Sequence, residues 1–541
     1  MSTTTTPPET TTAPGPWSPF RHAPFSVLWI ATVISNVGTW MNDVGAGWLM
    51  TELSPSPFIV AAVQAATTLP IFLFALLAGA IADIVDRRRM LLVVNVMLCI
   101  LATGVSFVVA IGAITPALLL VFTFLFGTGA AFMAPAWQAV VPKLVPRPEL
   151  PSAIALNSLG VNISRAIGPA LAGFLIVGLG IWSPFALNAA SILVIIAALL
   201  WWRPPGDGER RLPPEHVTGA IRAGLRYAIN SAPLKATLIR AGAFFLFASA
   251  YWAMLPLIAK DVLQGGPSLY GVLLASVGAG AVGGAIVLPK IRKKLGPNRT
   301  VAAGTIGTAL VLVAFALVPD QAVAAIASAV AGFSWIAVLS SMNVSAQTAL
   351  PDWVRARGLS VFLTVFFGSM SIGALIWGQV ASIAGIPTAL LIAATGIIIM
   401  IPLSCRAKLS QGESLDLTPS GHWSAPIVNI DAPTDRGPVM LQIAYEIAAE
   451  DEAAFQAAMD RLAHARKRNG GYGWTILQDT EEPRRFVETW FEASWTDHLR
   501  HHERVSEEDR AIQDEVHALH RGSETPRARH FLQPSKKEAD T

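Results

Sequence analysis

Long apolar segments recur along most of this 541-residue chain. A helix needs roughly 20 apolar residues to cross about 30 Å of hydrocarbon, and inside lipid the backbone must satisfy its own hydrogen bonds. Only 14% of the residues are charged, against about a quarter in soluble proteins, which excludes an ordinary soluble fold. The sequence predicts an all-α membrane protein with twelve transmembrane helices at about 25–50, 57–82, 90–114, 117–141, 152–178, 182–202, 238–259, 268–289, 300–318, 321–349, 359–382 and 384–404.

The membrane part carries the signature of an internal duplication. Positions in one half recur in the other at a constant offset of 205 residues: Gly79 and Gly284, Arg87 and Arg292, Gly168 and Gly373, Gly173 and Gly378. Chance can match one glycine, but a shared offset over separated segments indicates two homologous halves. Many secondary transporters are built from two such halves around a site near the middle of the membrane. We therefore expect two six-helix bundles, at 25–202 and 238–405.

Lysine and arginine lie almost entirely on one side of this twelve-helix arrangement. Of the 24 basic residues in 1–420, 22 fall on that side, Lys260 falls on the other, and Arg165 lies within a helix. Cytoplasmic loops of membrane proteins carry the excess of lysine and arginine. We therefore expect a multi-pass protein of the cell (inner) membrane with both termini in the cytoplasm.

The charge changes sign after the last apolar segment. Residues 1–420 carry a net charge of +10 and residues 421–541 a net charge of −7, so the overall +3 gives no indication of nucleic-acid binding. Alternating and helical patterns in the last part follow the order β-α-β-β-α-β, which predicts a ferredoxin-like domain. The expected organisation is a disordered cytoplasmic N-terminus at 1–24, the two bundles, a linker at 203–237 with an amphipathic helix at the cytoplasmic face, a linker at 406–436, a cytoplasmic domain at 437–533 and a tail at 534–541.

A charged motif follows the second apolar segment and reads Gly79-x-x-x-Asp83-x-x-x-Arg87-Arg88-Arg89. A glycine permits close helix approach, and a carboxylate at a helix end pairs with a cation or a facing helix N-terminus. Such a contact can form and break as two halves rock. The alternative is that the arginines only anchor the cytoplasmic side. The stretch resembles the loop motif of the major facilitator superfamily, although Ile84 and Asp86 depart from the usual pattern and the second copy has Leu288 in place of the acid.

A second stretch resembles one branch of that superfamily. It runs from Pro135 through Gln138 and Pro142 to Arg147, and continues to the Gly168-Pro169 pair in the fifth segment. The branch includes the bacterial enterobactin exporter and the transmembrane secretion effectors. The resemblance implies export of a small molecule, such as a siderophore, drug or secondary metabolite, driven by proton antiport. Gly168 and Pro169 also resemble the antiporter motif of drug exporters, where proline creates a bend; a plain packing kink is the alternative.

Two ionisable residues lie inside the apolar segments and are the candidates for coupling and substrate binding. Asp43 is the only acid well within the first segment, and Arg165, near the middle of the fifth, is the only base well within any segment. Charges in hydrocarbon are costly and usually face a cavity or a partner. We expect Asp43 to carry the proton, with Asn36 on its helix face, and Arg165, with Asn162 on its face, to tune that carboxylate or bind an anionic substrate group. The alternatives are an interfacial Asp43 and a structural ion pair for Arg165.

Further polar and aromatic residues are candidates for lining a central cavity. They are Trp40, Asn42, Gln64, Tyr251, Trp252, Asn343 and Gln347.

The C-terminal part holds eight of the ten histidines, including His498, His501, His502, His517 and His520. We interpret them as belonging to solvated helices, assign no metal ligand and expect no cofactor, although His517 and His520 share a helix face at i,i+3.

Other functions remain as alternatives to export. A transporter-fused enzyme would use the C-terminal domain to modify the exported compound, but the sequence shows no nucleophile–base pair or cofactor motif there. We expect no catalytic residue and interpret the domain as a regulatory or dimerisation element. An ATP-driven pump is excluded by the lack of a Gly-x-x-x-x-Gly-Lys-Ser/Thr stretch. A channel would leave the duplicated halves without a rocking role.

Overall fold

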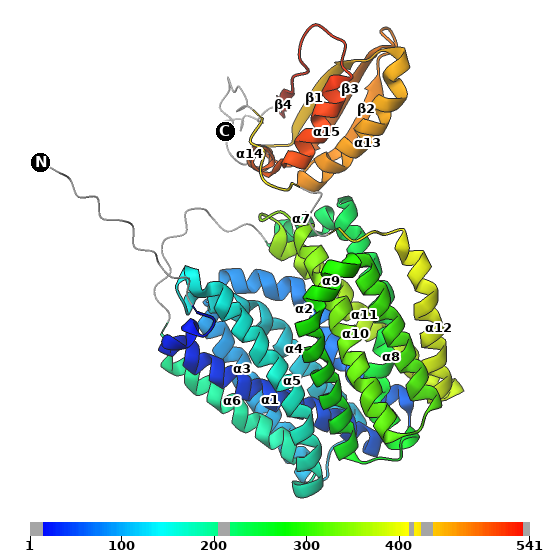
Figure 1. Cartoon of the computed structure of the whole chain (residues 1–541). Helices are drawn as coiled ribbons and strands as arrows, with labels where there is room; N and C mark the ends of the chain where they lie inside the picture. The colour runs from blue at the N-terminus through cyan, green and yellow to red at the C-terminus, as the bar shows by residue number, and fades with distance from the viewer. Residues whose placement is uncertain (1–14, 204–216, 411–415, 424–435, 534–541) are drawn as a thin grey trace, which may run out of the picture. The chain divides into compact units, whose positions relative to one another are not determined.

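A computed structural model describes residues 15–203, 217–410, 416–423 and 436–533 (Figure 1). The chain divides into two compact units. The first contains Met1–Pro214, Ala241–Ser340 and Leu363–Cys405, and the second contains Glu215–Arg240, Ser341–Phe362 and Arg406–Thr541. Three long helices, α8, α10 and α11, therefore contribute residues to both units.

The first unit consists of helices, and prolines open several of them at the position where a missing N–H costs nothing. Within the described residues, ten helices are long and apolar enough to cross a membrane, and α12 contains a shorter apolar stretch. The bounds are α1 Ala23–Leu53, α2 Pro57–Ile84, α3 Arg87–Ala110, α4 Pro116–Val140, α5 Leu150–Leu179, α6 Ser183–Trp201, α8 Ala232–Leu257, α9 Pro267–Leu317, α10 Gln321–Thr348, α11 Arg355–Ala384 and α12 Ile386–Cys405. Short turns lie at Ser18–Arg21, Val141–Lys143, Arg147–Glu149 and, as a π-helix, Ile258–Val262.

Helix α9 spans the two segments predicted at 268–289 and 300–318. It consists of two helices that meet at a kink at Gly296, whose φ of 73° and ψ of 169° leave the helical region. Glycine adopts a positive φ readily because it has no Cβ, and Pro297 follows directly. The basic run of Lys290, Arg292 and Lys293 lies just before this break.

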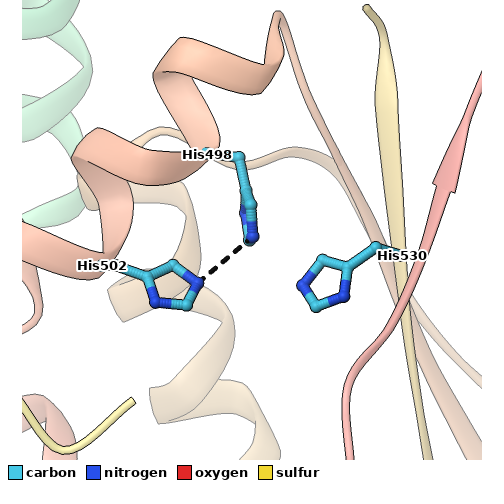
Figure 2. A group of neighbouring side chains, drawn as sticks. All are labelled: His498, His502 and His530. Atoms are coloured by element: carbon cyan, nitrogen blue, oxygen red, sulfur yellow. Dashed lines mark hydrogen bonds between the residues drawn. The ribbon is translucent and has the colours of Figure 1, made fainter. Parts of the chain in front are cut away.

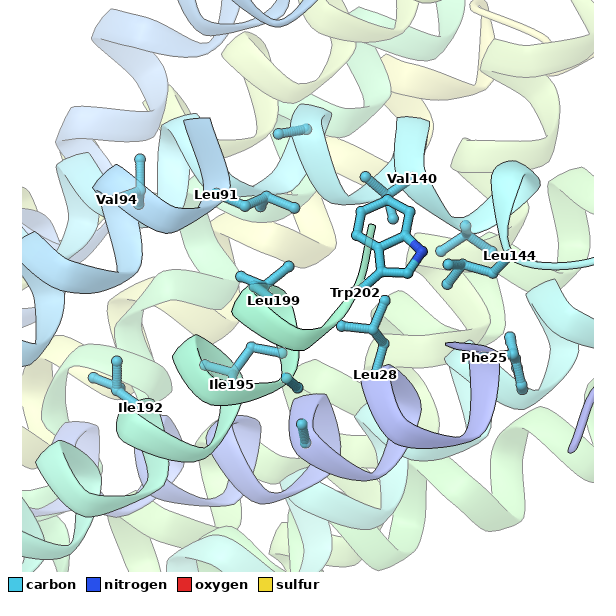
Figure 3. Packing of buried hydrophobic residues seen from close by; sticks show 14 of the residues in the cluster. Phe25, Leu28, Leu91, Val94, Val140, Leu144, Ile192, Ile195, Leu199 and Trp202 are labelled. Carbon is cyan, nitrogen blue, oxygen red and sulfur yellow. The ribbon is translucent and has the colours of Figure 1, made fainter. Parts of the chain in front are cut away.

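The first six helices pack around a shared apolar core (Figure 3). Leu28 of α1, Leu91 of α3, Val140 of α4 and Leu199 of α6 meet there beside Trp202. A polar contact fixes the same region, because Arg88 donates from Nε and Nη2 to the last carbonyls of α6, at 2.8 and 2.9 Å. A cation at a helix C-terminus is favoured by the helix dipole.

The second unit contains a four-stranded antiparallel sheet in the order β2-β3-β1-β4. The strands are β1 Val439–Glu446, β2 Tyr472–Gln478, β3 Arg485–Glu492 and β4 Arg529–Leu532, and the helices are α7 Val217–Asn230, α13 Glu452–Asn469, α14 Trp495–Arg504 and α15 Glu507–Ala518, with a short turn at Ala449–Asp451. Alternate residues of β1 and β3 are buried against α13 and α15, with Trp490, Tyr445 and Phe455 in the core.

Helix α7 lies where the sequence predicts an amphipathic helix, and it packs against α13. Arg226 donates to the carbonyl of Gly470 at the end of α13, at 3.2 Å. On the same helix, the Tyr227 hydroxyl donates to the carbonyl of Ala349, at 3.1 Å, and its ring meets Trp353 edge-on. Arg504, at the end of α14, lies 4.2 Å from the centroid of the Trp353 ring. The second unit therefore joins the sheet domain to the loop between α10 and α11.

Candidate transport site

A close helix crossing in the first unit joins α5 of one half to α9 of the other. A Cβ atom added at Gly271 would lie 2.5 Å from the carbonyl oxygen of Pro169, and one at Gly173 would lie 2.8 Å from that of Pro267. Further along α9, a Cβ atom added at Gly278 would lie 3.0 Å from the carbonyl oxygen of Arg165 and from Cα of Ala166. The Gly168-Pro169 segment predicted from the sequence therefore lies in a backbone-to-backbone crossing between the halves, as small residues permit.

A second crossing joins α2 to α11 and repeats this arrangement. A Cβ atom at Gly378 would lie 2.6 Å from the Cβ of Ala61. The backbone N–H of Phe58 donates to the Ser382 hydroxyl at 3.0 Å, and the hydroxyls of Thr68 and Ser371 are 2.7 Å apart.

The duplicated glycines have matching positions in these two crossings. Gly173 and Gly378 each face a helix of the opposite half, whereas Gly168 and Gly373 each face a helix of their own half. A Cβ at Gly168 would meet Trp40 of α1 at 2.6 Å, and one at Gly373 would meet the Leu246 carbonyl of α8 at 2.4 Å. The 205-residue offset in the sequence thus corresponds to equivalent packing in space.

Arg165 lies between α1 of its own half and α8 of the other. Its guanidinium carbon is 5.5 Å from the centroid of the Trp40 ring, within cation–π range. The guanidinium is also close enough to the Tyr251 phenol for electrostatic interaction. Residues from both halves therefore surround this cation.

Three buried polar atoms around Arg165 lack hydrogen-bond partners in the described part of the chain. They are Nε of Arg165, the hydroxyl of Tyr251 and Nε1 of Trp252. The Tyr251 and Trp252 rings are 5.4 Å apart, and although the indole N–H is near the phenol, neither atom reaches hydrogen-bonding geometry. Since buried donors are normally paired, this group suits a ligand that accepts hydrogen bonds.

Aromatic rings border this polar group. Trp335 of α10 lies 5.3 Å from Trp252 and 6.5 Å from Tyr251, measured between ring centroids. Phe244, Phe245 and Phe366 continue the aromatic surface around Trp335. Few polar groups within an aromatic surround are typical of small-molecule sites.

Asp43 lies one turn beyond Trp40 on α1 and is half-buried, as is Asn36. Asp43 interacts with the neighbouring Asn42 side chain, whose Oδ1 is buried and unpartnered. Among the described residues, Asp43 forms no ion pair with Arg165. On α5, the Asn162 side chain donates to the Ser158 carbonyl at 2.9 Å. The structure therefore does not join Asp43 and Arg165 directly.

Several other predicted residues lie outside this group. Asn343 and Gln347 belong to the second unit, are exposed and bond to each other at 2.8 Å. Gln64 is half-buried on α2.

In the predicted switch motif, Gly79 lies in α2 and Arg87 begins α3. The side chain of Asp83 lies outside the described residues. Arg88 bonds to α6, as described above, and Asp86 caps α3 by accepting from the Arg89 N–H at 2.7 Å.

The sequence interpretation missed the Trp40 contact with Arg165. Both residues were candidates, but for different roles, and they lie 125 positions apart in the sequence. A usable signal was present, since Gly168 lies one turn from Arg165 and permits α5 to approach α1 at Trp40.

A family model described as transmembrane secretion effector matches residues 14–538 of this chain. The chain belongs to that family, which is part of the major facilitator superfamily. It is thus a membrane transporter, and the resemblance found in the sequence is confirmed.

Curated relatives of this transporter are named as exporters or transporters of small molecules. It is 26% identical to the staphyloferrin A transporter of Staphylococcus aureus (strain NCTC 8325 / PS 47) over 48% of this chain and 65% of the relative, just under two thirds of its length. It is 26% identical to the enterobactin exporter EntS of Shigella boydii serotype 4 (strain Sb227), over 62% and 80% of the two chains. It is 23% identical to the multidrug efflux pump Tap of Mycolicibacterium fortuitum, over 68% and 91%.

Solved structures of transporters share the fold. A POT family transporter in complex with 5-aminolevulinic acid superposes with a TM-score of 0.59 at 13% identity, over 71% of this chain and 96% of that chain. A bacterial homolog of the human lysosomal transporter Spinster gives a TM-score of 0.55 at 16% identity, over 72% and 95%.

Proposed function

We propose that this transporter exports a small molecule across the cytoplasmic membrane by alternating access, with proton antiport as the energy source. The observation that carries the proposal is the group of buried, unpartnered polar atoms on Arg165, Tyr251 and Trp252, contributed by both halves. Binding a ligand there would satisfy these atoms, and movement of one half against the other would expose the site to either side. The named relatives include siderophore exporters and a drug pump, which supports the direction of transport.

The chemistry of this group indicates the class of substrate. A buried guanidinium favours a carboxylate, phenolate or similar acceptor, and the aromatic surround of Trp252 and Trp335 favours a ring-containing or amphipathic body. We therefore propose an aromatic or amphipathic compound with an anionic or hydrogen-bond-accepting group, as in siderophores, drugs and many secondary metabolites. Cells that produce the protein should accumulate less of such a compound than control cells. Equal accumulation across a panel of siderophores and antibiotics would contradict export.

We propose twelve membrane crossings with both termini in the cytoplasm. The 51 residues of α9 would extend about 75 Å, far more than one crossing needs. Its break at Gly296, beside the basic run, supports counting it as two crossings joined on the cytoplasmic side. Together with the other long helices and α12, this gives an even number, as the lysine and arginine distribution requires.

We assign Asp43 as the proton carrier, because it is the acid within the first predicted crossing and is half-buried one turn from Trp40. Replacing it by asparagine removes the titratable group while keeping the shape. Export by Asp43→Asn should become several-fold slower and lose its response to a proton uncoupler, because occupancy and protonation are no longer linked. Uptake of the compound into everted vesicles, with and without uncoupler, checks this.

Glu52 provides a matched control on the same helix. Its carboxylate accepts from the Trp48 indole N–H at 2.7 Å and is exposed. Glu52→Gln should keep both the rate and the uncoupler response. If Asp43→Asn also keeps them, the proton is carried elsewhere.

The C-terminal domain runs β1-α13-β2-β3-α14-α15-β4, which supports a ferredoxin-like sandwich, and we propose that it acts in assembly or regulation. The edge strand β2 exposes Tyr472 and Leu477, which supports a homodimer through this edge. The alternative, an enzyme fused to a transporter, is favoured by one observation, an open hollow of about 1000 Å³ lined by residues including Glu446, Arg485, His520 and Arg529. Mass spectrometry of the compound before and after transport by the full chain separates the two, since an enzyme would change its mass.

A further inference from the structure

Three histidines gather at one place in the C-terminal domain (Figure 2). His498 and His502 lie one turn apart on α14, and His530 lies on the edge strand β4. Figure 2 shows their rings turned toward a common space. One ring nitrogen from each lies within 4.8 Å of the others, and the Nε2 atoms of His498 and His502 are 3.2 Å apart.

This spacing matches a metal site. Zinc binds imidazole nitrogens at about 2.0–2.1 Å in tetrahedral geometry, which places the nitrogens of two ligands about 3.3 Å apart. The His498–His502 pair already has this separation, and small ring rotations bring in His530. Imidazole ligands suit zinc and similar transition metals, whereas calcium and magnesium prefer oxygen.

The neighbouring carboxylate fixes the orientation of one ring. Glu492 Oε2 is 2.8 Å from Nδ1 of His498, and both side chains are almost fully buried. Glu492 is further held by the Trp490 indole N–H, at 3.0 Å, and by Nδ1 of His501. A carboxylate bonded to one imidazole nitrogen leaves the other free as a ligand, and is the usual partner of a metal-binding histidine.

A further atom at the cluster lacks a partner. Nε2 of His530 is buried and makes no hydrogen bond in the described part of the chain. The rings of Trp495 and Trp423 border the cluster, at 5.1 Å from His498 and 4.9 Å from His502, respectively. These indoles border the cluster without offering a competing metal ligand.

We propose that His498, His502 and His530 bind one divalent transition-metal ion of the zinc type, with a fourth position open to water or to a donor atom of another molecule. Glu492 is the positioning residue. The ion links the four-residue strand β4 to α14. His517 and His520, noted in the sequence for their i,i+3 spacing, are not part of this site, because both nitrogens of His520 bond to backbone atoms of Glu446 and Glu524.

The test uses the full chain, purified in detergent without a polyhistidine tag and stripped with a chelator. Zn²⁺ alone is titrated by calorimetry, and Co²⁺ is added as a spectroscopic probe of tetrahedral nitrogen coordination. One equivalent of Zn²⁺ per chain is expected, with protection of the β4 backbone from hydrogen exchange in the zinc-loaded protein.

His502 and His530 are partly exposed, so variants at these positions should still fold. His502→Gln and His530→Gln should each weaken zinc binding by at least about tenfold, and His464→Gln, on the exposed face of α13, should leave it unchanged. Glu492→Gln should weaken binding by about 10- to 100-fold. No zinc uptake by the unaltered chain, or equal uptake by the His502→Gln/His530→Gln double variant, would overturn the proposal.

Discussion

Replacing Arg165 by glutamine is expected to lower the rate of export by about 10- to 100-fold. A hydrogen bond to a charged group contributes about 1.5–3 kcal/mol, and each 1.4 kcal/mol corresponds to a tenfold change in binding. Arg165 offers a buried, unpartnered Nε beside the Trp40 ring, so its contribution is available to the ligand rather than to the fold. Export is measured as uptake into everted vesicles, normalised to the amount of protein in the membrane.

A second variant separates charge from shape at position 165, and an arginine elsewhere in the chain serves as a control. Arg165→Lys keeps the positive charge but loses the planar fork, so an intermediate rate is expected. Arg299→Gln is the control, because Arg299 is exposed on α9 and its loss should leave the rate within about twofold. A normal rate of export by Arg165→Gln would contradict the assignment of Arg165 to the substrate site.

A single methyl group at Gly271 is expected to lower the rate of export at least about tenfold. The added Cβ would lie 2.5 Å from the Pro169 carbonyl oxygen, and 3.1 Å from Cα of Gly173, both backbone atoms that cannot rotate away. Helices α5 and α9 must then separate by roughly 1 Å to restore van der Waals contact. Because this crossing joins the two halves, Gly271→Ala should destabilise the conformation in which α5 and α9 are in contact. The same vesicle assay measures the loss.

Matched glycines on the same two helices provide the control. No heavy atom lies within 4 Å of a Cβ built at Gly283 of α9 or at Gly178 of α5. Gly283→Ala and Gly178→Ala should therefore export at the normal rate. Full activity of Gly271→Ala would show that close contact at this crossing is not needed for transport, and equal losses in all three variants would indicate a general effect on the helices.

The architecture of the membrane part was largely predictable because its physical constraints act locally. Apolar length defines the helices, and the shared offset of Gly173 and Gly378 identified positions that the structure places in equivalent crossings. The two helices within α9 meet at Gly296, which lies between the two apolar segments predicted at 268–289 and 300–318.

The sites depend on contacts between residues distant in sequence, and these were predicted less well. Arg165 was a candidate because a charge among apolar residues is conspicuous, but nothing local places it over Trp40. The sequence left open whether Arg165 tunes Asp43 or binds an anionic substrate group, because it does not constrain the relative rotation of α1 and α5. Likewise, His530 follows His502 by 28 residues, and only the antiparallel pairing of β4 with β1 brings it beside α14.

We propose above that the chain exports a small molecule in exchange for protons. The most direct measurement is uptake of candidate siderophores and antibiotics into everted vesicles that contain the protein, with a pH-sensitive dye recording proton movement. Substrate uptake that consumes the proton gradient and stops when an uncoupler is added is the predicted result. Uptake that persists without the gradient, or no uptake of any compound in a broad panel, would contradict proton-coupled export.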